Sequence, residues 1–245
     1  MFHFFAEHEN IHKEYIDIVG SDVNHIKNVV RLKAGDKILI SSGDNYDYNC
    51  TISEMTADYI RADIDSVNEK GNELKIDITL YQGLPKSDKM ELIIQKAVEL
   101  GCNRIVPVAM KRSVVKLDDK KAKSKVERSN NIALSAAKQS KRSIIPVVSE
   151  PMSYKAAIEE AAGDGTIILP YESAEGMKYT REIISSIKTG DKISIFIGPE
   201  GGFDLEEIGL ARDKDAKIIT LGKRILRTET AGMVMLSILM YEFEE

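Results

Sequence analysis

A glycine-rich run at 198–203, Gly-Pro-Glu-Gly-Gly-Phe, has the residue types of a ligand site. We call it the first glycine turn. It follows the apolar run 192–197, which predicts a buried strand. Glycine lets a backbone approach a ligand closely, and the helix expected at 204–211 would present unpaired N–H groups at its start. Ligands of open α/β sheets gather at the carboxyl ends of strands, so this turn is a candidate binding site. A plain strand-to-helix turn is the simpler alternative.

A second run, at 221–231, also lies between a predicted strand and a predicted helix. We call it the second glycine turn. Here Arg224 and Arg227 flank the apolar pair Ile225 and Leu226, which is an unusual pattern for a solvated loop. Apolar loop side chains can form a pocket wall for a flat heterocycle. We therefore expect the two turns to form one site, although a buried connection would give the same pattern.

Other common sites are not indicated. The chain has no G-x-G-x-x-G, no G-x-x-x-x-G-K-[ST] and no G-x-S-x-G, so a dinucleotide fingerprint, a P-loop and a nucleophile elbow are unsupported. Cys50 and Cys102 lack the spacing of metal ligands, and no cluster of His, Cys and Asp suggests zinc. We expect both cysteines to be ordinary core or surface residues, and we expect no metal site.

Basic charge is concentrated in one segment, although the net charge of the chain is −5. Residues 111–142 hold eleven basic and three acidic side chains, whereas residues 1–72 hold seven basic and thirteen acidic ones. A solvated helix face is the ordinary explanation of such a run. Its position between the candidate motifs favours a surface that contacts phosphates.

Two regions differ in their predicted elements. Residues 1–72 read as short strands at 37–41, 48–52 and 59–64, with one short helix at 23–30 that Ser21 or Asp22 could cap, and they predict a small β barrel. Residues 73–245 alternate between strands and helices, which implies a mainly parallel sheet covered on both faces. The expected strands are 75–81, 104–109, 166–169, 192–197 and 217–221, and the expected helices are 87–100, 120–139, 180–187, 204–211 and 230–243.

The helix boundaries carry their own signals. Asp204 as N-cap and Glu207 three residues later form a capping-box variant, and Thr228 or Thr230 could cap the last helix. No apolar run reaches the ~18–20 residues needed to cross a bilayer. The N-terminus also lacks the basic start and apolar run of a signal peptide. We therefore expect a cytosolic protein with an α/β domain and a smaller β domain.

The two glycine turns in this order resemble the knotted SPOUT methyltransferase superfamily, and more closely its RsmE family, which methylates N3 of a uridine in 16S ribosomal RNA. The resemblance spans nearly the whole chain. Its further matches are Gln82 to Lys86 with Lys89, Gln95-Lys96, Glu99 to Gly101, Arg112 to Lys116, Ala136-Ala137, Gln139-Ser140, Arg142, His25 and Val30-Arg31. The chain departs from the family at His3, where an arginine is usual, and at Ser135 and Lys138, where glutamates are common.

The resemblance implies a PUA-like RNA-binding barrel at 1–72 and a SPOUT methyltransferase domain at 73–245 with a trefoil knot. It further implies S-adenosylmethionine as the methyl donor, a homodimer, and 16S RNA or the small ribosomal subunit as partner. Because true knots are very rare, periodicity alone could not have indicated one. The implied donor-binding residues are Leu169, Gly198, Glu200, Gly201, Leu221, Gly222, Ile225, Leu226 and Thr230.

Uracil N3 must lose a proton during methylation, so a base or a polarising cation is needed. Our hypothesis is that Arg227 stabilises negative charge on a uracil oxygen and that Glu229 accepts the proton. A helix-start ion pair is the ordinary alternative for each. The expected RNA contacts are His3, His25, Arg31, Arg112, Lys116, Arg128, Gln139 and Arg142.

Three other functions remain open from the residues alone. One is a different SPOUT activity, such as ribose 2′-O methylation. The second is a non-catalytic RNA-binding or ribosome-assembly factor. The third is a metabolic enzyme that binds phosphate at 198–202, but this leaves the N-terminal region and the basic segment unexplained.

Overall fold

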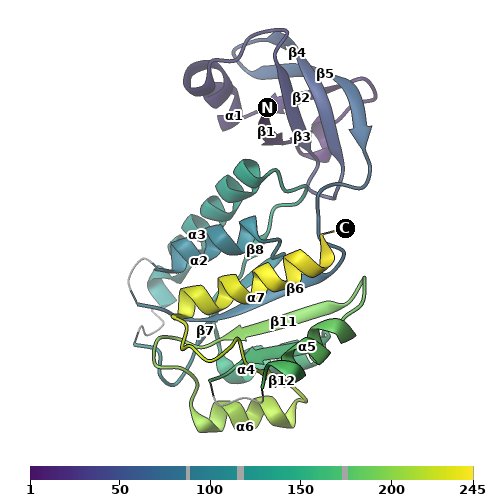
Figure 1. Cartoon of the computed structure of the whole chain (residues 1–245). Helices are drawn as coiled ribbons and strands as arrows, with labels where there is room; N and C mark the ends of the chain where they lie inside the picture. Colours follow the sequence, from purple (N-terminus) through teal and green to yellow (C-terminus); the bar gives the residue numbers. More distant parts are fainter. Residues whose placement is uncertain (87–88, 115–118, 173–175, 245) are drawn as a thin grey trace. The chain divides into compact units, whose positions relative to one another are not determined.

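The computed structural model describes residues 1–86, 89–114, 119–172 and 176–244, without the side chains of 119–122. The chain divides into two compact units (Figure 1). Unit 1 comprises Met1–Glu73 and Ala137–Ile145, and unit 2 comprises Leu74–Ala136 and Pro146–Glu245. The return of residues 137–145 to unit 1 was not expected from the sequence.

Unit 1 is built on a curled five-stranded sheet in the order β1-β3-β4-β5-β2. Its β1–β3 pair is parallel and its other pairs are antiparallel. Isoleucines at alternate positions, such as Ile38 and Ile40, fill its core. The order is open, so closure into a barrel stays a prediction. The strands are β1 (Phe2–Phe5), β2 (Tyr15–Val19), β3 (Lys37–Ser41), β4 (Asp47–Met55) and β5 (Tyr59–Asn68).

Three short helical segments accompany this sheet, namely η1 (His8–Asn10), α1 (Ser21–Asn24) and the π-helical η2 (His25–Val30). The last two overlap the predicted helix 23–30. The capping prediction was wrong, because Gly20 is the N-cap and no side chain caps the helix. Arg31 ends the segment in the left-handed conformation, with φ 61°.

Segment 137–145 is held in unit 1 by buried polar contacts. Asp47 accepts hydrogen bonds from Ser41 (2.5 Å) and from Ser143 (2.7 Å), and His3 Nε2 lies 2.7 Å from the Ser41 hydroxyl. The buried Arg142 guanidinium donates to Glu73 at 2.9 and 2.8 Å. Lys138 pairs with Asp22 at 2.8 Å. The contacts made by segment 137–145 join residues 69 to 116 positions apart in the chain. They also satisfy polar groups that would be costly to bury alone.

Unit 2 contains a seven-stranded parallel sheet in the order β12-β10-β11-β6-β7-β8, with β9 also paired to β7. This confirms an α/β fold with a parallel sheet. The very short β8 and β9 were not expected. The strands are β6 (Asp77–Gly83), β7 (Arg104–Ala109), β8 (Val147–Val148), β9 (Met152–Ser153), β10 (Thr166–Pro170), β11 (Lys192–Ile197) and β12 (Lys217–Ile219).

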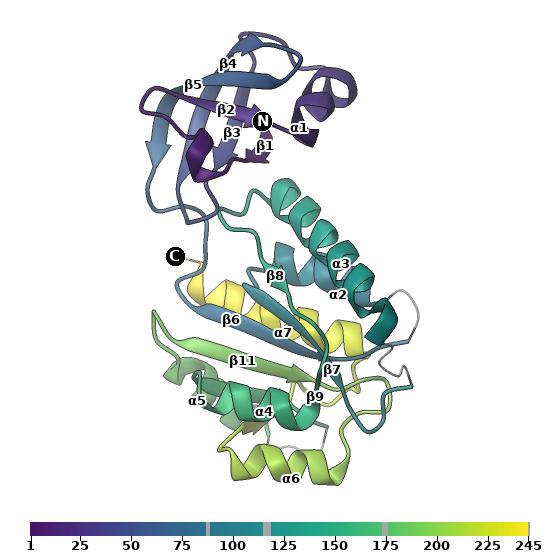
Figure 2. The ribbon, with the colours of Figure 1, turned by 180° about the vertical axis from the view of Figure 1, so that it is seen from behind.

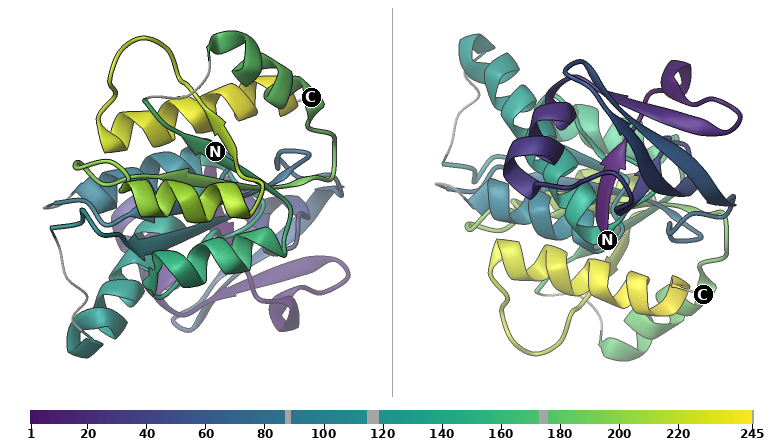
Figure 3. Two further views of the ribbon diagram at one scale, coloured as in Figure 1. Left: turned by 90° about the horizontal axis from the view of Figure 1, so that it is seen from below. Right: turned by 90° about the horizontal axis from the view of Figure 1, so that it is seen from above.

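Helices cover both faces of this sheet. The helices are α2 (Lys89–Glu99), α3 (Asp119–Ser140), α4 (Tyr154–Ala162), α5 (Met177–Ser186), α6 (Leu205–Asp213) and α7 (Thr228–Phe243). Helix α7 packs against α2 and β11, and α4 packs against β7, β10 and α6. Figures 1 and 2 show α7 and α4 on opposite faces, and the left view of Figure 3 places the sheet between them. Among the described residues, no helix has both the length and the apolar character to cross a membrane.

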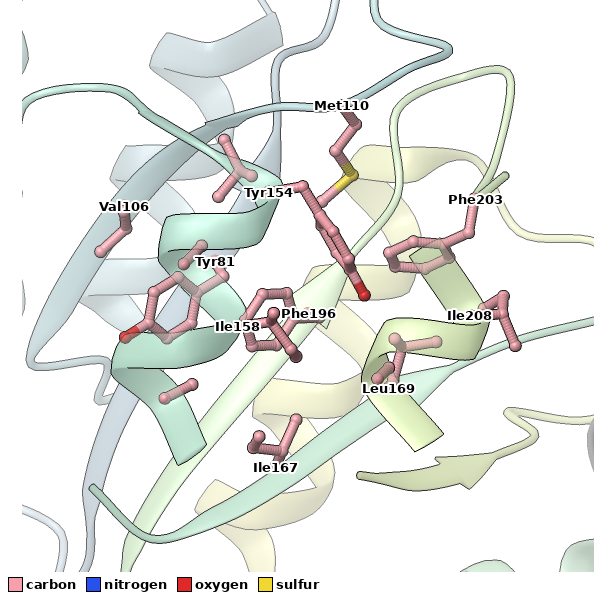
Figure 4. Close-up of a cluster of buried hydrophobic side chains, with 14 residues drawn as sticks. Tyr81, Val106, Met110, Tyr154, Ile158, Ile167, Leu169, Phe196, Phe203 and Ile208 are labelled. Atoms are coloured by element: carbon pink, nitrogen blue, oxygen red, sulfur yellow. The ribbon is translucent and has the colours of Figure 1, made fainter. Parts of the chain in front are cut away.

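The face under α4 and α6 has an aromatic core (Figure 4). Tyr81 and Phe196, from the neighbouring strands β6 and β11, stack with ring centroids 4.5 Å apart. Tyr154 meets Phe196 edge-on and donates a hydrogen bond to the Glu207 carbonyl. Asp204 and Glu207 form the expected capping box at the start of α6. The core therefore fixes both the strand before the first glycine turn and the helix after it.

Candidate functional site

The two glycine turns line one cavity of about 450 Å³ in unit 2, beyond the carboxyl ends of β10, β11 and β12. Both turns follow parallel strands, which explains why they meet at one edge of the sheet. The lining residues are Lys89, Arg112, Pro170, Tyr171, Glu172, Ile197 to Phe203, Thr220 to Gly222, Arg224 to Thr228 and Ala231.

The first glycine turn is tightly enclosed by its neighbours. A Cβ atom at Gly83 would lie 2.6 Å from the backbone nitrogen of Pro199, and one at Gly201 would lie 2.9 Å from Cβ of Arg112. Arg112 also donates a hydrogen bond to the Gly201 carbonyl at 3.2 Å. Such approaches require glycine. The shape of this turn is therefore fixed by packing.

The second glycine turn is held near its ends and exposed in its middle. Thr180 donates a hydrogen bond to the Thr220 carbonyl at 2.8 Å, and Gly222 has φ +116°. Leu221 and Leu226 are half-buried, whereas the Ile225 side chain is 83% exposed. This turn thus presents apolar side chains at the cavity without close packing around Ile225.

A buried polar link joins the two turns. The Thr228 hydroxyl donates to the Gly198 carbonyl at 2.6 Å and accepts from the Gln82 amide at 2.8 Å. Thr228 is the first residue of α7, and Arg227 is the N-cap without a side-chain capping bond, so the prediction that Thr228 or Thr230 caps this helix was wrong. The Thr228 side chain instead fixes where α7 begins relative to β6 and β11.

Lys89 lies between two carboxylates at the cavity. Its Nζ is 3.0 Å from Glu200 Oε1 and 3.2 Å from Glu229 Oε2. The hydrogen bond to Glu200 raises the pKa of Lys89 above its ordinary value. Burial raises the pKa of Glu200, but hydrogen bonds from its own backbone N–H, from Lys89 and from the Lys86 N–H outweigh burial, so its pKa lies below the ordinary value. The Lys89 ammonium and the Glu200 carboxylate are thus stabilised in their charged forms.

Most of the residues expected to bind the donor line the cavity, namely Gly198, Glu200, Gly201, Leu221, Gly222, Ile225 and Leu226. Leu169 does not, because its side chain is fully buried in the aromatic core, and its neighbours Pro170 and Tyr171 face the cavity instead. Thr230 is half-buried and outside the lining. Of the expected catalytic pair, Arg227 lines the cavity and Glu229 does not.

The residues expected to contact RNA lie in several environments. His25, Arg31 and Gln139 are exposed in unit 1, and Arg128 is exposed in unit 2, where it pairs with Glu91 at 2.7 Å. Arg112 lines the cavity, and Lys116 lies outside the described residues.

His3 and Arg142 are 5% and 4% exposed and are engaged with Ser41 and Glu73. These two predictions therefore need correction. Because their side chains are buried among protein partners, they support the structure of unit 1 and do not present a surface to phosphates.

Sequence reasoning gave no role at the site to Gln82, Lys89 or Thr228. Gln82 is the second-last residue of β6, which neighbours β11 in the sheet, and Lys89 is the first residue of the helix that follows β6. The start of a helix after a central strand was a usable signal for Lys89. The contact between Gln82 and Thr228 spans 146 positions in the chain, and nothing local in the sequence indicates it.

Comparisons with known proteins show which family the chain belongs to. A family model described as an RNA methyltransferase domain matches residues 72–240, and one described as an RNA methyltransferase PUA domain matches residues 20–65. The fold and the matched domains thus define an RNA methyltransferase with an N-terminal PUA domain.

Individual relatives narrow the family. Ribosomal RNA small subunit methyltransferase E of Bacillus subtilis is 38% identical over 93% of this chain and 90% of its own length. Its namesake from Mesomycoplasma hyopneumoniae is 32% identical over 97% and 98%. A crystal structure of the Neisseria gonorrhoeae enzyme of that name, bound to S-adenosylmethionine, matches with a TM-score of 0.83 and 27% identity over 99% and 98%. The chain belongs to the ribosomal RNA small subunit methyltransferase E family, the RsmE family that its motifs resemble.

Proposed function

We propose that this protein transfers a methyl group from S-adenosylmethionine to N3 of a uridine in 16S ribosomal RNA of the small subunit. The observation that carries the proposal is the single cavity lined by both glycine turns. Membership of the family supports the proposed reaction. The relative from Neisseria gonorrhoeae, whose crystal structure is bound to S-adenosylmethionine, supports the proposed methyl donor.

The residues of the cavity fit such a donor. Leu221, Ile225 and Leu226 offer an apolar wall for adenine, and a Cβ built at Gly202 or Gly222 meets no atom within 4 Å, so the backbone there is open to a ligand. When bound, the donor's sulfonium supplies an activated methyl group. The protein must orient the acceptor base and exclude water.

The acceptor edge of uracil is its Watson–Crick edge, so the base must be unpaired or flipped out. We assign Arg227, which lines the cavity, to the stabilisation of negative charge on a uracil oxygen as N3 loses its proton. Glu229 is reassigned. Its carboxylate lies outside the cavity lining and pairs with Lys89, so we give it a supporting role and not that of proton acceptor.

The proposed RNA contacts are the exposed basic and polar residues among those expected from the sequence. They are His25, Arg31 and Gln139 in unit 1, and Arg112 and Arg128 in unit 2. Because phosphate contacts release counterions, RNA affinity should fall steeply between ~50 and ~200 mM salt. An affinity that stays flat over this range would remove the phosphate-contact assignment.

Three further features belong to the proposal: a trefoil knot in unit 2, a homodimer, and action in the cytosol. Support for the knot is the membership of the chain in the family whose resemblance implies it. Support for the dimer is α7, which is rich in Met and Leu and carries the exposed aromatic residue Tyr241 near its end. Light scattering of the purified protein measures the oligomeric state, and a monomer at micromolar concentration would contradict the dimer.

The decisive test is methylation of 16S RNA and of small ribosomal subunits, with nucleoside analysis of the product. N3-methyluridine supports the proposal, and a 2′-O-methyl nucleoside assigns the other SPOUT activity. Calorimetry with S-adenosylhomocysteine accompanies it, because a non-catalytic RNA-binding factor would not need the donor site. An Arg227→Ala protein should bind the analogue as the wild type does and methylate at least ~10-fold more slowly.

A further inference from the structure

Lys89 is the basic residue at the start of α2, and it contacts both parts of the candidate site. Its ammonium lies about 3 Å from Glu200, in the first glycine turn, and from Glu229, in the first helical turn of α7. The Lys89 side chain is 32% exposed, and that of Glu229 only 14%. Such partly buried charges are screened by solvent less than surface charges are.

The Lys89 ammonium lies between two carboxylates that are close to each other. Since each carboxylate oxygen lies about 3 Å from one nitrogen, the two oxygens lie within about 6 Å of each other. Without the ammonium they would be two like charges at the cavity edge. Glu200 is further fixed by the Lys86 N–H, at 3.1 and 3.3 Å, so the segment after β6 and the start of α2 both hold this carboxylate.

We infer that Lys89 is a positioning residue for the methyl-donor site, holding the first glycine turn and the start of α7 at a fixed separation through its two carboxylate partners. The inference rests on the proposed function, because it assumes that the cavity binds the methyl donor. It assigns Lys89 no contact with the donor and no proton transfer.

The first test is calorimetry with S-adenosylhomocysteine on the full-length protein. At about pH 7.5, Lys89→Met should raise its Kd at least ~10-fold, because the two carboxylates then repel each other and separate the turns. Lys89→Arg should restore most of the affinity. The matched control is Lys96→Met, which removes a lysine of similar exposure from the same helix, where it pairs with Glu99 at 2.7 Å. The control should bind as the wild type does.

A second variant distinguishes positioning from direct donor contact. In a Lys89→Met/Glu229→Gln protein one of the repelling charges is gone, so much of the affinity should return. If the double variant stays as weak as the single one, the positioning role is wrong.

Hydrogen exchange without any ligand gives a readout independent of binding. Amides at 198–202 and 228–231 should exchange faster in Lys89→Met than in Lys96→Met, while those of β7 stay unchanged. Equal exchange in both variants overturns the inference. A wild-type protein that fails to bind the analogue contradicts the proposed function, whereas wild-type binding with an equally tight Lys89→Met contradicts only the role of Lys89.

Discussion

The two glycine turns share one cavity but are stabilised differently. The first is packed against its neighbours on one side, where a Cβ at Gly83 or Gly201 would collide with Pro199 or Arg112, and is open beside Gly202. The second has open space beside Gly222, and Ile225 is 83% exposed. The difference indicates that packing within the protein fixes the shape of the first turn, whereas the second turn is positioned mainly through its ends.

Gly83→Ala should have the largest effect, since it tests the enclosure of the first turn. The added Cβ would lie 2.6 Å from a backbone nitrogen that cannot move without displacing the turn. We expect the free energy of unfolding to fall by about 3 kcal/mol in urea denaturation, with loss of S-adenosylhomocysteine binding. Gly209→Ala in α6, where a Cβ meets nothing within 4 Å, is the control and should not destabilise the protein. Equal stability of the Gly83→Ala and Gly209→Ala proteins would show that the first glycine turn is not tightly packed at Gly83.

Thr228→Val tests the link between the turns and should come next. The substitution keeps the shape and removes the hydroxyl that contacts the Gly198 carbonyl and the Gln82 amide. Leaving buried groups without partners should lower the free energy of unfolding by about 2 kcal/mol. Thr228→Ser retains the hydroxyl and should recover most of that loss. A valine variant as stable as the serine variant would show that the hydrogen bonds are not what joins the turns.

Gly222→Ala addresses the backbone of the second turn. The space around Gly222 is open, so any cost arises from its φ of +116° and not from collision. We expect a loss of about 1 to 2 kcal/mol in unfolding free energy. At Gly176 the space is also open and φ is −66°, so Gly176→Ala should cost less. A larger cost at position 176 would count against the conformational explanation.

Ile225→Ala should have the smallest effect on stability and separates binding from folding. Because the side chain is 83% exposed, the free energy of unfolding should change by less than about 0.5 kcal/mol. The Kd for S-adenosylhomocysteine should nevertheless rise ~3- to 10-fold, because the ligand would lose apolar contact area. Leu205→Ala, 74% exposed on α6 and outside the cavity lining, should leave both values unchanged. Unchanged binding in the Ile225 variant would remove this residue from the pocket wall.

Local patterns predicted the parallel sheet, the helices that alternate with its main strands and the meeting of the two turns. The run 192–197 became β11, and the Asp204–Glu207 capping box formed as expected. Strands β1 and β2 and helix α4 were missed, because short or weakly periodic segments take their structure from the sheet or core that they join.

The errors at the candidate sites have a different origin. His3 was expected to contact RNA because it stands where the resembling family usually has an arginine, and Arg142 because it belongs to the basic segment 111–142. Ser41 and Glu73, 38 and 69 positions away, make their burial tolerable. Leu169 was placed in the pocket by the family resemblance, but its side chain points into the aromatic core. Which face a side chain takes, and which distant partner it meets, are properties of the folded chain that spacing does not contain.

The return of residues 137–145 to unit 1 makes the N-terminal region dependent on a later part of the gene product. A polypeptide ending at Glu73 would contain all five strands of the curled sheet, yet it would lack Ser143, Arg142 and Lys138, the partners of Asp47, Glu73 and Asp22. Its carboxylates would then remain without those partners. During synthesis on the ribosome, unit 1 can therefore be completed only after more than half of the chain has emerged.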